Sequence, residues 1–148
     1  MARQKFGGVT DQGKAGIQRL DDAKSLQRNK RWRGAMYLAG YSVECLLKKK
    51  LMIKFGCHTL LQLEEELRRR RRLKESESVF SHSLESLFRL AGGFDRARQR
   101  RETFAAFNVV NEWVPAWRYS PDTASAASCE DFVDSVEAML EWINNNVG

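Results

Sequence analysis

The carboxylate with the most unusual surroundings is Glu44, which lies between Val43 and Cys45 in the most apolar stretch of the chain. A buried carboxylate there needs a cation, because an unpaired charge in apolar surroundings is strongly destabilising. The sequence offers two partners. Lys48, one helical turn later, would form a surface pair. Arg118 would form a buried pair if its own segment folds back over this stretch. Both alternatives stay open on sequence alone.

Arg118 belongs to an unusual segment, WVPAWRYSP at residues 113–121. Its two prolines favour a loop or tight corner, and two tryptophans and a tyrosine accompany the arginine. An arginine in this setting can stack on a ring, pair with a buried acid or bind a phosphate. The alternative is that the corner only closes the end of a helical bundle. If a ligand binds, we expect Arg118, Tyr119 and Lys48 to contact the phosphate of a nucleotide or nucleic acid.

The two histidines, His58 and His82, each stand beside a serine or threonine just before a predicted helix. Capping or a solvent-exposed position is the commonest explanation for such residues. Neither has a second histidine or a cysteine at metal-ligand spacing, and the adjacent Cys57 does not complete a site with His58. A phosphate-binding glycine loop, a GxSxG turn and an HExxH motif are also missing. We therefore expect no metal, no cofactor and no catalytic residue of these kinds.

Thirteen of the 25 lysines and arginines gather in three short runs, at residues 48–50, 68–74 and 96–101. The second run contains five consecutive arginines, residues 68–72, which is a pattern that can follow the phosphates of RNA or DNA. It can also complement the dipole at a helix end and pair with the glutamates at positions 64–66. We favour the second interpretation, because consecutive arginines point all around a helix and no aromatic residue is interleaved for base stacking.

Length and composition exclude several classes of protein. The 148 residues suit a single domain spanning the whole chain, and 43% hydrophobic with 30% charged residues is typical of a globular chain. The net charge is +6, and no apolar run approaches the length of a membrane span. The N-terminus lacks the apolar core of a secretory signal, so we expect a cytoplasmic protein. Three widely spaced cysteines indicate buried, reduced thiols.

Apolar residues recur at helical spacing almost throughout, and no segment alternates like a strand. The first helix is expected to begin near Thr10 or Asp11, leaving residues 1–9 as a flexible N-terminus. The stretch from about Arg33 to Lys54 is apolar nearly all round, which predicts the central helix of a bundle. Further helices are expected at about 60–72, after a Ser83 cap, from Asp95 through Val110, and from about Ser128 onward. The sequence therefore predicts an all-α, up-and-down bundle of five or six helices.

Four segments together resemble a known family. They are YLAGYSVECLLK at residues 37–48, HSLESL at 82–87, WRYS at 117–120 and the closing helix to Trp142-Ile143. In this order they resemble the HEPN domain (higher eukaryotes and prokaryotes nucleotide-binding) over about residues 10–147. The resemblance implies a helical bundle, frequently a homodimer, that acts on RNA or accompanies a nucleotidyltransferase in toxin–antitoxin and defence systems.

Many HEPN proteins are metal-independent ribonucleases whose site pairs an arginine with a histidine a few residues later. Here Arg118 is followed by Tyr119-Ser120 and no histidine as far as Ser125. This departure favours a non-catalytic module that binds nucleotide, nucleic acid or a nucleotidyltransferase partner. A ribonuclease toxin is the second hypothesis, and a purely structural dimerisation protein is the third.

A homodimer is expected on independent grounds. The predicted central helix is apolar on more sides than one small bundle easily covers, so part of it should be buried between subunits. In addition, residues 119–148 contain six acids and no lysine or arginine. This acidic segment could meet the arginine runs of a second subunit, or simply face solvent.

Overall fold

The computed structural model describes residues 8–121 and 123–148, and the part it describes is helical, with one isolated antiparallel bridge between Gly8 and Thr59. The all-α prediction is confirmed, but the expected five or six helices are too few. The described residues contain seven α-helices and one 3₁₀ helix: α2 (Val9–Arg28), α3 (Trp32–Lys54), α4 (Leu60–Arg69), α5 (Leu84–Leu90), α6 (Phe94–Arg98), α7 (Arg101–Val110), η1 (Pro115–Tyr119) and α8 (Ala126–Asn146).

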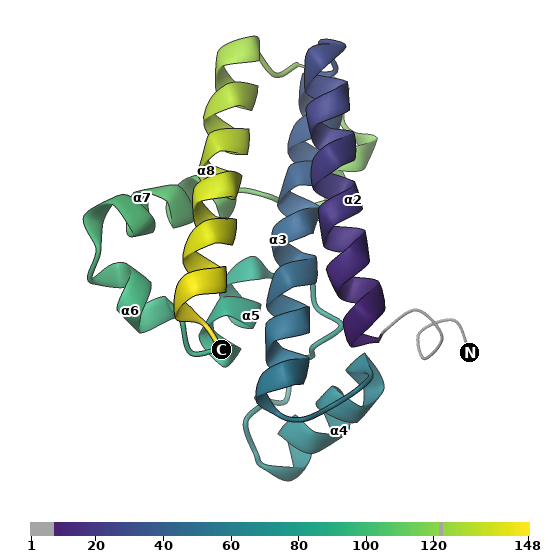
Figure 1. Cartoon of the computed structure of the whole chain (residues 1–148), viewed down its shortest axis with the longest axis vertical. Coiled ribbons are helices and arrows are strands. Elements are labelled where there is room, and N and C mark those ends of the chain that lie inside the picture. The colour runs from purple at the N-terminus through teal and green to yellow at the C-terminus, as the bar shows by residue number, and fades with distance from the viewer. Residues whose placement is uncertain (1–7, 122) are drawn as a thin grey trace.

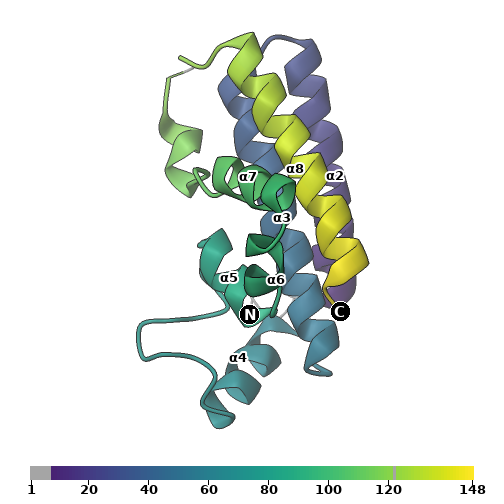
Figure 2. The same ribbon diagram turned by 90° about the vertical axis from the view of Figure 1, so that its left-hand side faces the viewer.

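Helix α3 is the centre of the fold, as its apolar character predicts. The long helices α2 and α8 run alongside it (Figure 1), and α2 makes the most extensive packing. Of the shorter helices, α5 packs on α3 and α7 packs on α8, on the side away from α2 (Figure 2), and α6 packs on both α5 and α7. Twelve residues of α3 are buried. Its Ile53 is the one large apolar side chain of this helix that stays exposed.

The burial of α3 removes one of the two grounds for expecting a homodimer. The apolar sides of this helix are covered within the chain itself, by α2, α8, α5 and η1. A short bundle can cover a central helix on all sides because its connecting segments, and not only its long helices, contribute apolar side chains. A homodimer stays a prediction, but the surface first expected to form it is already buried.

Three helix boundaries differ from the predicted ones for local reasons. Helix α4 ends at Arg69, before the expected Arg72, because Arg71 adopts a left-handed conformation with φ 55°. The helix expected from Asp95 is two helices, since Arg100 is extended between them. Helix α8 begins at Ala126 because Ser125 and Ser128 form a reciprocal capping box.

The N-terminal segment and the cysteines can also be compared with the prediction. Residues 1–7 of the expected flexible segment lie outside the described residues, while the Val9 amide donates to the carbonyl of His58 at 3.3 Å. All three cysteines are buried and none forms a disulfide, as predicted. Within the described ranges, every helix is too short or too polar to cross a bilayer.

Candidate functional site

Glu44 is the most deeply buried charged residue of α3, with 2% of its surface exposed. Its Oε2 accepts a hydrogen bond from the Nζ of Lys48 at 3.2 Å, and Lys48 is itself 5% exposed. Its Oε1 lies 2.6 Å from Nδ1 of His82, whose side chain is half exposed. Both carboxylate oxygens are therefore engaged, one from the same helix and one from the segment that precedes α5.

The predicted buried pair between Glu44 and Arg118 is wrong. Glu44 instead pairs with Lys48, which was the alternative partner. The pair is buried, however, and not at the surface as that alternative predicts. His82 holds the second oxygen of Glu44. A carboxylate has two oxygens and several acceptor sites, so a buried glutamate needs more than one donor. This requirement is the signal that would have identified a second partner.

The corner at residues 113–121 is held by its first tryptophan. Trp113 is 3% exposed and donates from Nε1 to the carbonyl of Tyr37 at 2.8 Å. Its ring stacks on that of Tyr37 at 6.0 Å and meets Tyr41 edge-on at 6.1 Å. Gly40 makes this approach possible, because a Cβ there would lie 2.2 Å from the indole.

The second tryptophan of the corner also packs against the bundle. The Trp117 ring lies 5.3 Å from that of Phe132 on α8, and the guanidinium of Arg33 covers it at 4.7 Å. The two tryptophans therefore pack against the bundle and cover part of its surface. Arg118 and Tyr119 are left at the surface, with the guanidinium 4.8 Å from the tyrosine ring. The electrostatic interaction with Tyr119, and to a smaller extent that with Tyr37, raises the pKa of Arg118.

Arg118 borders a cleft of about 590 Å³ between α2, α3 and η1. Helix α2 contributes Lys14 and Arg19 to its walls, and α3 contributes Tyr37 and Tyr41. Arg19 also forms an exposed ion pair with Asp22 at 3.3 Å. The cleft thus combines three cationic side chains and the carboxylate of Asp11 with two aromatic rings. Its net positive charge and its rings suit a ligand that carries both phosphate and a planar base.

Two residues that line the cleft, Cys45 and Tyr41, have raised pKa values and so keep their protons at neutral pH. Burial raises the pKa of the Cys45 thiol from 9.0 to about 12, with nearby Glu44 acting in the same direction. Burial and then Glu44 also raise the pKa of Tyr41. Cys45 therefore provides no thiolate nucleophile, because a reactive cysteine requires a lowered pKa.

The structure brings together only part of the predicted site. Arg118 borders the cleft, and Tyr119 lies beside it with 77% of its surface exposed. Lys48 does not line the cleft, because its ammonium group is buried on Glu44. Lys14, Arg19, Tyr37 and Tyr41 were missed, since only the packing of α2 on α3 brings them to Arg118. Within the described ranges, histidine, cysteine and acidic side chains do not assemble in threes around a potential metal position.

Comparison of the chain with protein-family models, with curated proteins and with solved structures finds no match.

Proposed function

We propose that this protein is a non-catalytic, HEPN-like binding module whose cleft between α2, α3 and η1 binds a nucleotide or a segment of RNA. The observation that carries the proposal is the composition of that cleft: Lys14, Arg19 and Arg118 beside the rings of Tyr37 and Tyr41. Arginine forks suit phosphate oxygens, and tyrosine rings offer a stacking surface to any base. The volume of about 590 Å³ falls within the range of small-molecule sites.

The resemblance of the YLAGYSVECLLK segment to HEPN domains supports a wider setting for this binding. In that setting the protein forms a homodimer and works with a nucleotidyltransferase partner in a toxin–antitoxin or defence system. The charge distribution is compatible with a second subunit, because the exposed face of α8 carries acids while the rest of the chain is strongly basic. The cleft supplies the ligand-binding part of this proposal, and the acidic helix supplies a surface for the partner.

Equilibrium titration tests the proposal directly. AMP, ATP and a short single-stranded RNA are titrated into the protein and binding is followed by calorimetry. Arg118→Ala should weaken the tightest of these ligands about tenfold or more, because it removes a charge-assisted contact to phosphate. Arg101→Ala, which removes an exposed arginine that does not line the cleft, is the matched control. Binding that is absent for all three probes, or insensitive to Arg118→Ala, would overturn the proposal.

One observation favours the second hypothesis, a metal-independent ribonuclease. His82 is oriented by a buried carboxylate through Nδ1, while its ring is half exposed. A carboxylate on one ring nitrogen fixes the tautomer and leaves the other nitrogen available as a base. RNA cleavage in the presence of a chelator distinguishes the two hypotheses. Cleavage that disappears in His82→Ala would make the protein an enzyme, whereas an intact substrate with the wild-type protein supports the binding module.

A further inference from the structure

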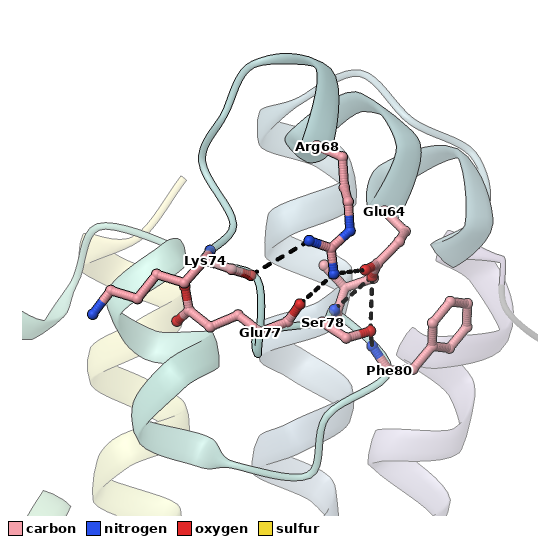
Figure 3. Close-up of polar contacts among 7 residues, drawn as sticks. Glu64, Arg68, Lys74, Glu77, Ser78 and Phe80 are labelled. Atoms are coloured by element: carbon pink, nitrogen blue, oxygen red, sulfur yellow. Dashed lines mark hydrogen bonds and ion pairs between the residues drawn. The ribbon is translucent and has the colours of Figure 1, made fainter.

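The five arginines at residues 68–72 differ in the partners that they bind. Arg68 is committed to the fold: it donates to Oε1 of Glu64 at 3.1 Å, to the Glu77 carbonyl at 2.5 Å and to the Lys74 carbonyl at 3.4 Å (Figure 3). These bonds tie the loop that follows α4 back to the helix. Arg68 is therefore not available to a ligand.

The next two arginines share one carboxylate. Arg69 and Arg70 both donate to Glu66, at 2.5 Å and 2.6 Å, and these bonds lower the pKa of Glu66. One carboxylate neutralises one of the two guanidinium groups. Arg71 and Arg72 follow at the helix end and are both exposed. The end of α4 consequently carries an excess of positive charge at the surface.

An aromatic ring from another helix lies among these cations. Phe55 caps the end of α3, and three cationic groups lie near its ring: Arg70 at 5.4 Å, and Arg72 and Lys54 at 5.8 Å each. Gly56, at φ 67°, turns the chain immediately after Phe55 toward α4. The aromatic residue that the arginine run lacks in sequence is thus supplied by the fold.

We propose that this group of residues, the Phe55 patch (Lys54, Phe55, Arg69, Arg70, Arg71 and Arg72), binds single-stranded nucleic acid. It adjoins a hollow of about 570 Å³ that Phe55, His58, Gln62 and Arg69 line together with Glu65 and Glu66. The five cations of the patch outnumber these two carboxylates. Phosphates bind the guanidinium groups, and a base stacks on Phe55 and on the neighbouring guanidinium planes. A single strand is required because a base inside a duplex is not free to reach the ring.

The Phe55 patch shares no residue with the cleft at Arg118, so the two sites are tested separately. Fluorescence anisotropy is measured with a labelled 12-nucleotide RNA, a DNA of the same sequence and the corresponding RNA duplex, each between 50 and 200 mM salt. The comparison of the RNA with the DNA of the same sequence shows whether the sugar contributes to affinity. Arg118→Ala reports on the cleft, and its failure to change affinity leaves the patch proposal standing.

Variants of the patch separate stacking from charge. Phe55→Leu should weaken single-strand binding about tenfold without changing the salt dependence, whereas Phe55→Tyr should retain binding. Arg71→Gln/Arg72→Gln should lower the slope of log K against log salt by about 1.4, at roughly 0.7 per phosphate contact on a single strand. Arg100→Gln/Arg101→Gln removes the same charge from another cluster and should change the slope much less. Circular dichroism checks that each variant is folded.

Three outcomes would each overturn the proposal. One is an equal loss of affinity in the two arginine double variants, which would indicate that binding depends only on the net charge of the protein. Another is duplex binding as tight as single-strand binding. The third is unchanged affinity in both Phe55→Leu and Arg71→Gln/Arg72→Gln.

Discussion

Nδ1 of His82 lies 2.6 Å from Oε1 of Glu44, although 38 residues separate the two in the chain. This contact fastens the segment before α5 to the middle of α3. The other oxygen of Glu44 accepts from Lys48, so the buried carboxylate receives one donor from a permanent cation and one from an imidazole. The arrangement stabilises the local fold and at the same time presents a half-exposed histidine ring with a fixed orientation.

Lys48→Met should destabilise the protein by about 3–5 kcal/mol, because it leaves the carboxylate of Glu44 buried without its cation. Urea denaturation at pH 7 measures this loss. The matched control is Lys49→Met, one residue later on the same helix, which should cost less than about 1 kcal/mol. Adding Glu44→Gln to Lys48→Met should restore part of the stability, since no unpaired charge remains. Equal losses for both lysine variants would contradict the prediction.

The buried thiol of Cys45 should make stability fall at alkaline pH. Its pKa is raised from 9.0 to about 12 in the folded protein, so above pH 9 the unfolded chain releases a proton that the folded chain keeps. Fewer protons on the unfolded state means that stability decreases with pH, by about 2 kcal/mol at pH 10.5 from this one group. Thermal unfolding from pH 8 to 10.5 should show a shallower decline in Cys45→Ala than in the wild type. Parallel curves would show that Cys45 titrates normally.

Gly40→Ala should disturb the corner that carries Arg118. The added methyl group would lie 2.2 Å from the Trp113 ring, so the indole or the helix must move, at a cost of about 1–3 kcal/mol. Gly34→Ala on the same helix is the control: its nearest neighbour, Cδ1 of Leu26, is 3.4 Å away, and the change should be neutral or stabilising by up to about 1 kcal/mol. Near-ultraviolet circular dichroism and thermal unfolding distinguish the two variants. An unchanged tryptophan signal in Gly40→Ala would contradict the expected displacement.

Glu64→Ala should release the loop between α4 and α5. Oε2 of Glu64 accepts from the backbone amide of Val79 at 2.8 Å and from the Ser78 hydroxyl at 2.9 Å. Without this acceptor the fully buried Val79 amide loses its partner, so its hydrogen exchange should accelerate about tenfold or more. Exchange measured by nuclear magnetic resonance tests this. Glu65→Ala, at the exposed neighbouring position, should leave the Val79 rate unchanged, and a similar acceleration there would indicate a general loosening of α4.

The local features of the chain follow from its sequence. Helix α3 is central because its residues are apolar nearly all round, and Ser83 caps α5 by accepting from the Ser86 amide, as expected. Pairs between the glutamates and arginines of α4 also form, although Glu66 takes both Arg69 and Arg70. These features depend on residues within one or two helical turns, where spacing alone determines which side chains meet.

The tertiary structure decides which distant groups meet, and here the outcome differs from expectation. Glu44 could pair with Lys48 or Arg118 by charge alone. Its pair with Lys48 follows from helical spacing, whereas the packing of the His82 segment on α3 adds His82 as the second partner. In the same way, Phe55 meets the arginine run only because the chain turns at Gly56. Electrostatic attraction does not specify a partner by itself, since every cation on the chain attracts a carboxylate. The geometry of the apolar core brings particular charges within reach and excludes water from them.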